Sequence, residues 1–174
     1  MKKLIACLVI ISTFICLFGC NSSDKNDKKE EATRESVVDG YFTYIKQDDG
    51  TYSVTATDKN NFPEEVKIPT TYNGVAVTAI EDSAFSGCVG LRKITVPDSI
   101  VRLPYGAFYM CPDLEDVNLP STISGIGQGA FGVCEKEIHI YFDGTTKQWG
   151  NISKAGNWAS ETKYYVHCSD GIAK

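Results

Sequence analysis

The side chains best suited to catalysis or metal binding in this sequence are its two histidines and seven cysteines. His167 and Cys168 are adjacent, and a histidine beside a cysteine is the pair with which thiol enzymes activate a nucleophile. Tyr164, Tyr165 and Val166 precede the pair in a stretch typical of a strand. Because neighbouring side chains of a strand point to opposite faces, the imidazole and the thiol are not expected to meet. We therefore interpret the pair as structural.

The rest of the sequence offers little to catalysis or to metal binding. Asp48-Asp49-Gly50 is a pattern that also begins calcium loops, but the later ligand positions are missing, which favours a hairpin turn. Cys88, Cys111 and Cys134 lack the close spacing of zinc ligands. Neither a G-x-S-x-G motif nor a phosphate-binding glycine loop is present. The sequence thus predicts a protein that is not an enzyme and has no catalytic residue, cofactor or metal.

The same three cysteines end a short phrase that recurs every 23 residues. The phrase begins Ala-Phe each time and occupies residues 84–88, 107–111 and 130–134. A fixed period of this length predicts a solenoid of stacked coils, in which the cysteine is a core position that behaves as a small hydrophobe. Neighbouring coils lie about 4.8 Å apart, so disulfides between coils are within reach, although parallel side chains would strain them. We favour buried free thiols, with paired cysteines, including Cys168, as the alternative.

Apolar residues between the phrases also repeat in register. Residues 91–97 align with residues 114–120, and both follow the L-x-x-L-x-L pattern of a leucine-rich repeat strand. Val66 and Ile68 fit the same strand positions in a partial upstream coil, which is followed by the hairpin signal Asn73-Gly74. The repeated apolar positions predict that each coil turns one side inward and depends on its neighbours for a core.

Together these residues resemble the BspA-type leucine-rich repeats of bacterial surface proteins. The resemblance is carried by Ile68-Pro69 with Asn73-Gly74, by the Ala-Phe phrases with Leu91, and by the tail 144–149 with His167-Cys168. It implies a mostly β fold, a short right-handed leucine-rich repeat solenoid with N- and C-terminal caps. It implies no particular activity, because that family is defined by its scaffold.

The N-terminus is typical of an exported lipoprotein. Lys2 and Lys3 precede an apolar stretch that is short for a membrane span, which predicts a signal peptide. Leu17-Phe18-Gly19-Cys20 resembles the lipobox of bacterial lipoproteins. That resemblance implies cleavage before Cys20 and attachment of lipid, with acyl chains such as palmitate, to its thiol. The alternative is a plain signal peptide with a chance cysteine.

The sequence therefore divides into five segments. Residues 1–19 are the predicted signal peptide, and residues 20–39 are the lipidated cysteine and a disordered tether, since residues 21–36 contain a single apolar side chain, Ala32. The leucine-rich repeat domain, residues 40–174, consists of an N-terminal cap over 40–65, repeats over 66–143 and a C-terminal cap over 144–174. We expect Trp149 and Trp158 to be buried in that last cap, with a carbohydrate site as the alternative.

Outward-facing strand positions should form columns across the coils. Two columns alternate in charge, one of them Glu65, Lys93, Asp116 and His139, the other Glu64, Arg92 and Glu115. A third column contains Lys67, Thr95, Asn118 and Tyr141. Solenoids use such faces for recognition, so Thr95, Asn118 and Tyr141 are the candidate ligand-binding residues, with a plain solvated face as the alternative.

These observations favour a function without catalysis. A net charge of −5 argues against a nucleic-acid partner. We expect a binding or adhesion module that is exported, lipid-anchored to the bacterial cell membrane and facing outward, with a protein or glycan ligand outside the cell. The alternative is an envelope structural or accessory subunit that recruits a neighbouring membrane protein, and an enzyme is a third interpretation.

Overall fold

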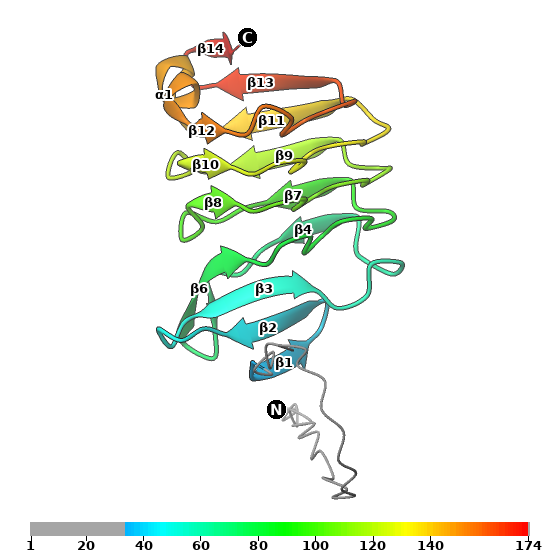
Figure 1. The fold of residues 1–174 in the computed structure, drawn as a ribbon, viewed down its shortest axis with the longest axis vertical. Coiled ribbons are helices and arrows are strands. Elements are labelled where there is room, and N and C mark those ends of the chain that lie inside the picture. Colours follow the sequence, from blue (N-terminus) through cyan, green and yellow to red (C-terminus); the bar gives the residue numbers. More distant parts are fainter. Residues whose placement is uncertain (1–33, 174) are drawn as a thin grey trace, which may run out of the picture.

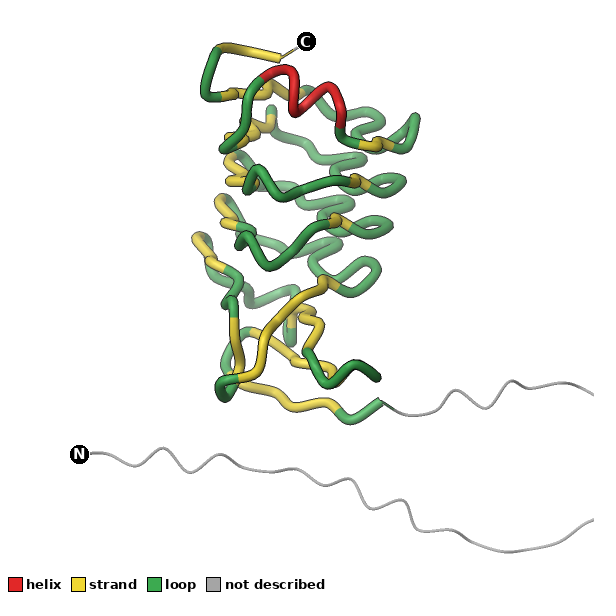
Figure 2. The backbone as a smooth tube through the Cα atoms, turned by 90° about the vertical axis from the view of Figure 1, so that its left-hand side faces the viewer, coloured by secondary structure: helices red, strands yellow, loops and turns green. Residues whose placement is uncertain are grey.

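The structure is a computed structural model that describes residues 34–173, whose elements stack along one axis (Figure 1). The predicted signal peptide, Cys20 and most of the predicted tether lie outside the described residues. The strands of a main sheet follow one side of the stack, and the short strands of a second sheet follow another (Figure 2).

The main sheet contains one strand from each coil. Its parallel strands are β4 (Glu65–Lys67), β7 (Lys93–Thr95), β9 (Asp116–Leu119), β11 (Ile138–Phe142) and β13 (Tyr164–Cys168), and antiparallel β14 (Gly171–Ala173) follows β13 at the edge. Ile94 pairs with Val117, and Val117 pairs with Ile140, so the register repeats every 23 residues as predicted. The predicted β-solenoid is therefore confirmed.

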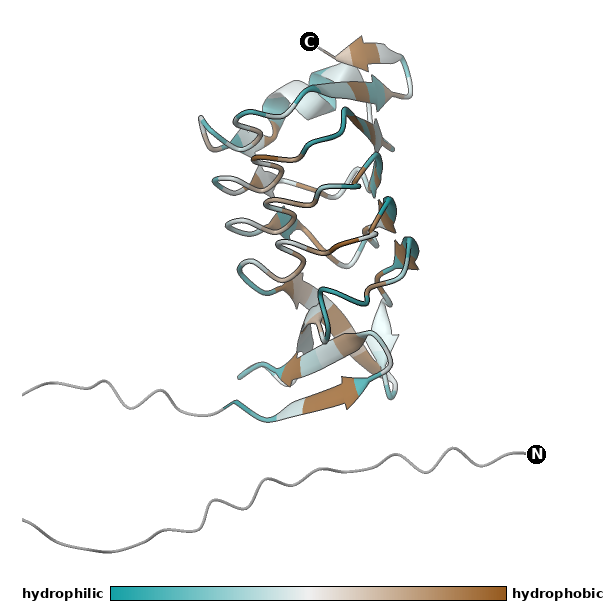
Figure 3. Ribbon diagram, turned by 90° about the vertical axis from the view of Figure 1, so that its right-hand side faces the viewer, coloured by the Kyte–Doolittle hydropathy of each residue, from teal (hydrophilic) through white to brown (hydrophobic). Residues whose placement is uncertain are grey.

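A second, smaller sheet lies across the core from the first. It consists of the parallel strands β8 (Arg102–Leu103), β10 (Gly125–Ile126) and β12 (Ser153–Lys154). Leu91, Ile94 and Leu103 are almost fully buried between the two sheets, and the next coil buries the matching residues. Apolar segments recur from coil to coil along the stack (Figure 3).

The phenylalanines of the repeated phrase form one continuous file inside the stack. The ring centroids of Phe85 and Phe108 are 5.5 Å apart with an angle of 10° between the planes. Those of Phe108 and Phe131 are 5.3 Å apart at 17°. Phe42 meets the first ring edge-on, and Trp158 meets the last ring edge-on. Because the stacked rings are fully buried, the file holds successive coils in register.

The cysteines of the described residues are free thiols, as the favoured interpretation predicted: Cys88, Cys111, Cys134 and Cys168. Two of them donate along the stack to a carbonyl of the preceding coil, Cys111 Sγ to Phe85 O at 3.0 Å and Cys134 Sγ to Phe108 O at 3.3 Å. Burial raises the pKa of the Cys88 thiol to about 12. These thiols therefore stay protonated and serve as packing groups.

A separate sheet closes the N-terminal end of the stack. Its strands are β1 (Ser36–Asp39), β2 (Phe42–Lys46), β3 (Tyr52–Ala56), β6 (Val75–Ile80) and β5 (Thr71–Tyr72), in that order. The predicted hairpin turn joins β2 to β3, and the Asp49 carboxylate accepts hydrogen bonds from the amide and hydroxyl of Thr51. Asn73 and Gly74 have φ of 49° and 79°, the left-handed turn expected between β5 and β6.

The tether predicted for residues 20–39 was wrong at its C-terminal end. Residues 36–39 form β1, which pairs antiparallel with β2. Its two valines are adjacent and flanked by polar residues, so the segment is too short for a clear alternating pattern. β1 gains its backbone hydrogen bonds from the open edge of β2 and contributes little to the core.

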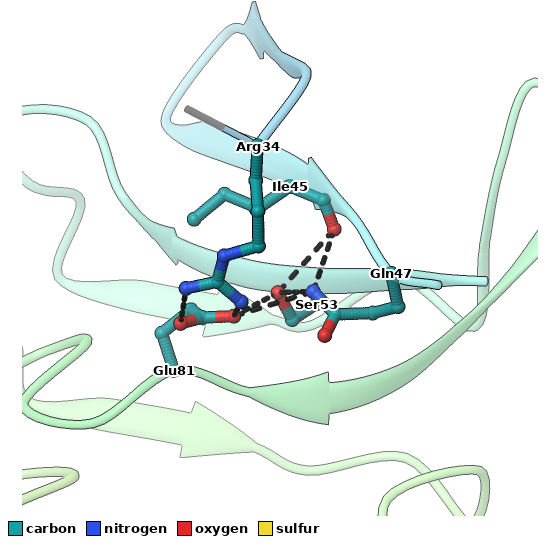
Figure 4. A network of polar contacts seen from close by, with 5 residues as sticks. All are labelled: Arg34, Ile45, Gln47, Ser53 and Glu81. Carbon is teal, nitrogen blue, oxygen red and sulfur yellow. Dashed lines mark hydrogen bonds and ion pairs between the residues drawn. The ribbon is translucent and has the colours of Figure 1, made fainter. Parts of the chain in front are cut away.

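A polar network fixes the residues that lead into β1 (Figure 4). Arg34 donates two hydrogen bonds to the carboxylate of Glu81, at 2.9 and 3.1 Å. The hydroxyl of buried Ser53 also donates to Glu81, and the amide of Gln47 donates to Ser53 Oγ at 2.7 Å. Through these contacts the segment before β1 is attached to both β3 and the end of β6.

The segment predicted as a C-terminal cap, residues 144–174, is a further coil of the solenoid in its described part. It supplies β12 to the second sheet and β13 to the main sheet. Gly125 pairs with Ser153 and Ile138 with Tyr164, offsets of 28 and 26 residues that hid this coil from a search for a 23-residue period. The longer offset arises where α1 (Thr146–Asn151) is inserted, with a capping box formed by Thr145 and Gln148. No helix in the described part of the chain is long and apolar enough to cross a membrane.

Candidate binding face

The main sheet turns one face outward, and the predicted columns lie on it. Glu65 pairs with Lys93, Lys93 with Asp116, and Asp116 with His139. The column continues onto β13, where His139 pairs with Tyr165. Thus the predicted alignment is confirmed, and it extends one coil further than predicted.

The three candidate ligand-binding residues lie on adjacent strands of this face. Thr95 pairs with Asn118, whose Nδ2 donates to Thr95 Oγ1 at 3.1 Å, and Asn118 pairs with Tyr141. Tyr141 is 39% exposed, and its column continues to His167. The ring of Tyr141 stacks on that imidazole, with centroids 4.9 Å apart. The structure therefore brings all three candidates together and adds an aromatic surface at one end.

Within the two charged columns of the described residues, the alternation of charge produces only one close ion pair. Arg92 Nη2 lies 2.8 Å from Glu115 Oε2, as predicted from their alignment. Lys93 shares register with Glu65 and Asp116, but it lies within 4 Å of neither carboxylate in this part of the chain. The predicted order of charges is confirmed, whereas close pairing holds for Arg92 and Glu115 alone.

Two histidines meet at the C-terminal end of the face, which the sequence did not predict. His139 Nδ1 and His167 Nε2 are 3.0 Å apart. Their 28-residue separation differs from the repeat, so spacing gave no hint of contact. The strand-like alternation of residues 164–168 was the available signal, because pairing it with residues 138–142 places both imidazoles on one face.

The surface beside these residues is shallow and mainly acidic. Glu115, Asp116, Lys136, Glu137 and His139 line one depression. A second shallow depression lies at the other end of the face, along β4 and β7. Partial burial, followed by the charge of Asp116 and a hydrogen bond to it, raises the pKa of Tyr141. Within residues 34–173, no three histidine, cysteine or acidic side chains converge as a set of metal ligands.

The adjacent His167 and Cys168 side chains do not meet, and the two tryptophans are buried. His167 faces outward against Tyr141, whereas Cys168 packs against the core, so the two side chains diverge as predicted. Burial, and then the charge of Asp170, raises the pKa of Cys168, which keeps its thiol protonated. Trp149 and Trp158 are buried as predicted, but in a further coil of the solenoid and not in a separate cap.

Comparison with known proteins agrees with this architecture. The sequence pattern of the BspA type leucine rich repeat region matches residues 55–156 in six copies. Among solved structures, a leucine rich cell surface protein from Faecalibacterium prausnitzii A2-165 is similar, with 24% identity and a TM-score of 0.41. The similarity covers 68% of this chain and 42% of that protein, so the chain spans less than half of its length. No curated protein matches the chain.

Proposed function

Because the chain belongs to the BspA-type leucine-rich repeat family, we propose that it is a cell-surface binding or adhesion module without catalytic activity. The ligand is a protein or glycan outside the cell, and it is recognised by the outward face of the main sheet. The family identifies the scaffold, and the properties of this face support the assignment of a binding role.

The column of Thr95, Asn118 and Tyr141 is the observation that carries the proposal. It places a hydroxyl, an amide and an exposed aromatic ring on three successive strands. Aromatic rings beside hydrogen-bonding groups are common in recognition surfaces, because they bury large apolar area while polar neighbours set orientation. The depressions on the face are shallow, which suits the surface of a macromolecule better than a small enclosed substrate.

We also propose that lipid on Cys20 holds this module on the outer side of the bacterial membrane. The support is the residue pattern 17–20, which lies outside the described residues. Acyl chains bind a bilayer with about 0.8 kcal/mol for each buried methylene, so stable attachment requires more than one chain. The net negative charge of the protein would not itself attract it to anionic lipids.

Binding is tested with cells that display the full chain. These cells are screened against extracellular matrix proteins, glycans and purified envelope material, and Tyr141→Ala should reduce binding of any ligand found at least tenfold. Tyr105→Ala is the matched control, because Tyr105 is 57% exposed and lies outside the main sheet. Equal losses in both variants, or no ligand in any screen, would contradict the proposal. Cross-linking in intact cells only to a neighbouring membrane protein would favour an accessory subunit.

Anchoring is tested separately through Cys20. The wild-type chain should incorporate labelled palmitate and fractionate with membranes, whereas Cys20→Ala should lose the label and the modified N-terminus. Cys168→Ala provides the control for a general effect of removing a thiol. Unchanged labelling of the Cys20→Ala chain would exclude this cysteine as the lipid site.

A further inference from the structure

The two histidines of the chain come together on the outward face. His139 lies on β11 and His167 on the adjacent parallel strand β13, two residues beyond Tyr165, the register partner of His139. His139 Nδ1 and His167 Nε2 face each other at 3.0 Å, and both side chains are half-buried. One edge of each imidazole therefore contacts the other imidazole and not the core.

Aromatic neighbours restrict the orientation of both rings. Tyr141 stacks on His167 with 4.9 Å between centroids and 17° between planes. Tyr165 stacks on His139 with 5.7 Å between centroids and 21° between planes. Ordered imidazoles lose less side-chain entropy when they bind a ligand, so this packing prepares the two nitrogens to act together.

A carboxylate lies on the opposite side of the His139 ring. Glu137 Oε1 is 3.6 Å from His139 Nε2. A carboxylate in this position favours a proton on Nε2, which leaves the lone pair of Nδ1 directed toward His167. Glu115, Asp116 and Glu137 also outnumber Lys136 around the adjacent depression, so the local charge attracts cations.

We propose that His139 Nδ1 and His167 Nε2 bind one divalent transition-metal ion, of the class Zn²⁺, Ni²⁺ or Cu²⁺, with water in the remaining coordination positions. Two neighbouring imidazole ligands about 2.1 Å from an octahedral ion lie about 3.0 Å apart, which matches the observed separation of the nitrogens. Imidazole suits these ions and not Ca²⁺ or Mg²⁺, which prefer oxygen ligands. The site does not depend on the function proposed above.

When both rings are neutral, binding needs a change of tautomer and a small rotation of the rings, because nitrogens 3.0 Å apart with 5.2 Å between the ring centroids point almost directly at each other. The Nε2–H of His167 can donate to His139 Nδ1 in the free protein. When the ion binds, the His167 proton resides on Nδ1 of the same ring, and both facing nitrogens become ligands.

The test is calorimetric titration of the full chain in detergent, purified without a histidine tag and stripped with EDTA. At pH 7.5, NiCl₂ or ZnCl₂ should bind with one ion per chain at this site. His139→Gln and His167→Gln should each weaken binding at least tenfold, and Glu137→Gln should weaken it about tenfold through loss of the supporting carboxylate. Lys136→Gln is the matched control, and it should bind the ion at least as tightly as the wild type.

Several outcomes would overturn the site. Unchanged affinity in the double variant His139→Gln/His167→Gln would show that other groups bind the ion. Equal binding of CaCl₂ would assign the cation to carboxylates. Electron paramagnetic resonance of the Cu²⁺ complex must show hyperfine coupling to two imidazole nitrogens, and coupling to fewer contradicts the site. Circular dichroism melts confirm that each variant is folded.

Discussion

At the N-terminal end of the stack a mixed sheet that contains the β2–β3 hairpin lies against the first coil, whereas at the C-terminal end the chain runs through one more coil of the solenoid. Both ends face the same physical problem, because the outermost coil exposes a core and an edge of unpaired backbone groups. The first end combines buried aromatic residues with the polar network of Arg34, Ser53 and Glu81. The last coil uses Trp149 and Trp158.

The difference shows which forces each end depends on. Trp158 contacts Phe131, Trp149 and Tyr164, so the C-terminal end is held mainly by burial of apolar rings. The network around Glu81 depends on a charged carboxylate that accepts several hydrogen bonds. We therefore expect the two ends to respond differently to truncation of a ring, loss of an acceptor and acid.

Truncation of the aromatic ring at the C-terminal end should have the largest effect. Trp158→Ala removes a buried indole from the last ring contact of the phenylalanine file and should lower the free energy of unfolding by about 3–5 kcal/mol. Urea denaturation followed by circular dichroism measures the change. Tyr105→Ala, which truncates an exposed ring, is the control, and a loss for Trp158→Ala no larger than the control would contradict the role assigned to this end.

Loss of the acceptor at the N-terminal end should have an intermediate effect. Glu81→Ala leaves the buried Ser53 hydroxyl with only its longer contact to Ile45 O, at 3.4 Å, and releases Arg34, which should cost about 1–2 kcal/mol of unfolding free energy. Hydrogen exchange should show faster exchange in β1 and β3 than in β13. Glu81→Gln keeps an acceptor oxygen and should lose less. Uniform acceleration of exchange in all strands would argue against a local role.

Acid should weaken the N-terminal end specifically. Burial raises the pKa of Glu81, but hydrogen bonds from Ser53, Arg34 and Gln47 outweigh it, so the pKa lies below its usual range. Ionised Glu81 therefore stabilises the folded state at pH values above the ordinary glutamate pKa of about 4.3. This stabilisation is lost as the pH falls through the lower pKa of the folded state. Urea midpoints measured between pH 6 and pH 3 should fall more for the wild type than for Glu81→Gln. Parallel pH profiles would disprove the assignment.

Reversal of one charge in the middle of the stack should have the smallest effect on stability. Arg92→Glu places two like charges at the exposed pair with Glu115, so the melting temperature should fall slightly, and less than for Glu81→Ala. The double reversal Arg92→Glu/Glu115→Arg should restore most of the loss, measured by thermal denaturation at low ionic strength. A double variant no more stable than the single variant would show that the pair contributes nothing.

The middle of the molecule was predictable because identical positions recur at a constant interval. Phe85, Phe108 and Phe131 are equally spaced in the sequence, and coils of equal length stack with equivalent residues in contact. The three rings therefore lie in one file. The columns ending at Tyr141 and His139 followed from the same register. Both ends were harder to predict, because neither β1 nor the last coil repeats the residues of the coils between them.

The sequence by itself determined the period and the inward and outward positions of the repeated coils. Each of these depends on local pattern, which repetition makes unambiguous. Only the tertiary structure decided that residues 36–39 pair as a strand and that His139 meets His167. The strand pairing depends on the open edge of β2, and the histidine contact depends on the length of the last coil. Neither can be deduced from the residues that make the contact.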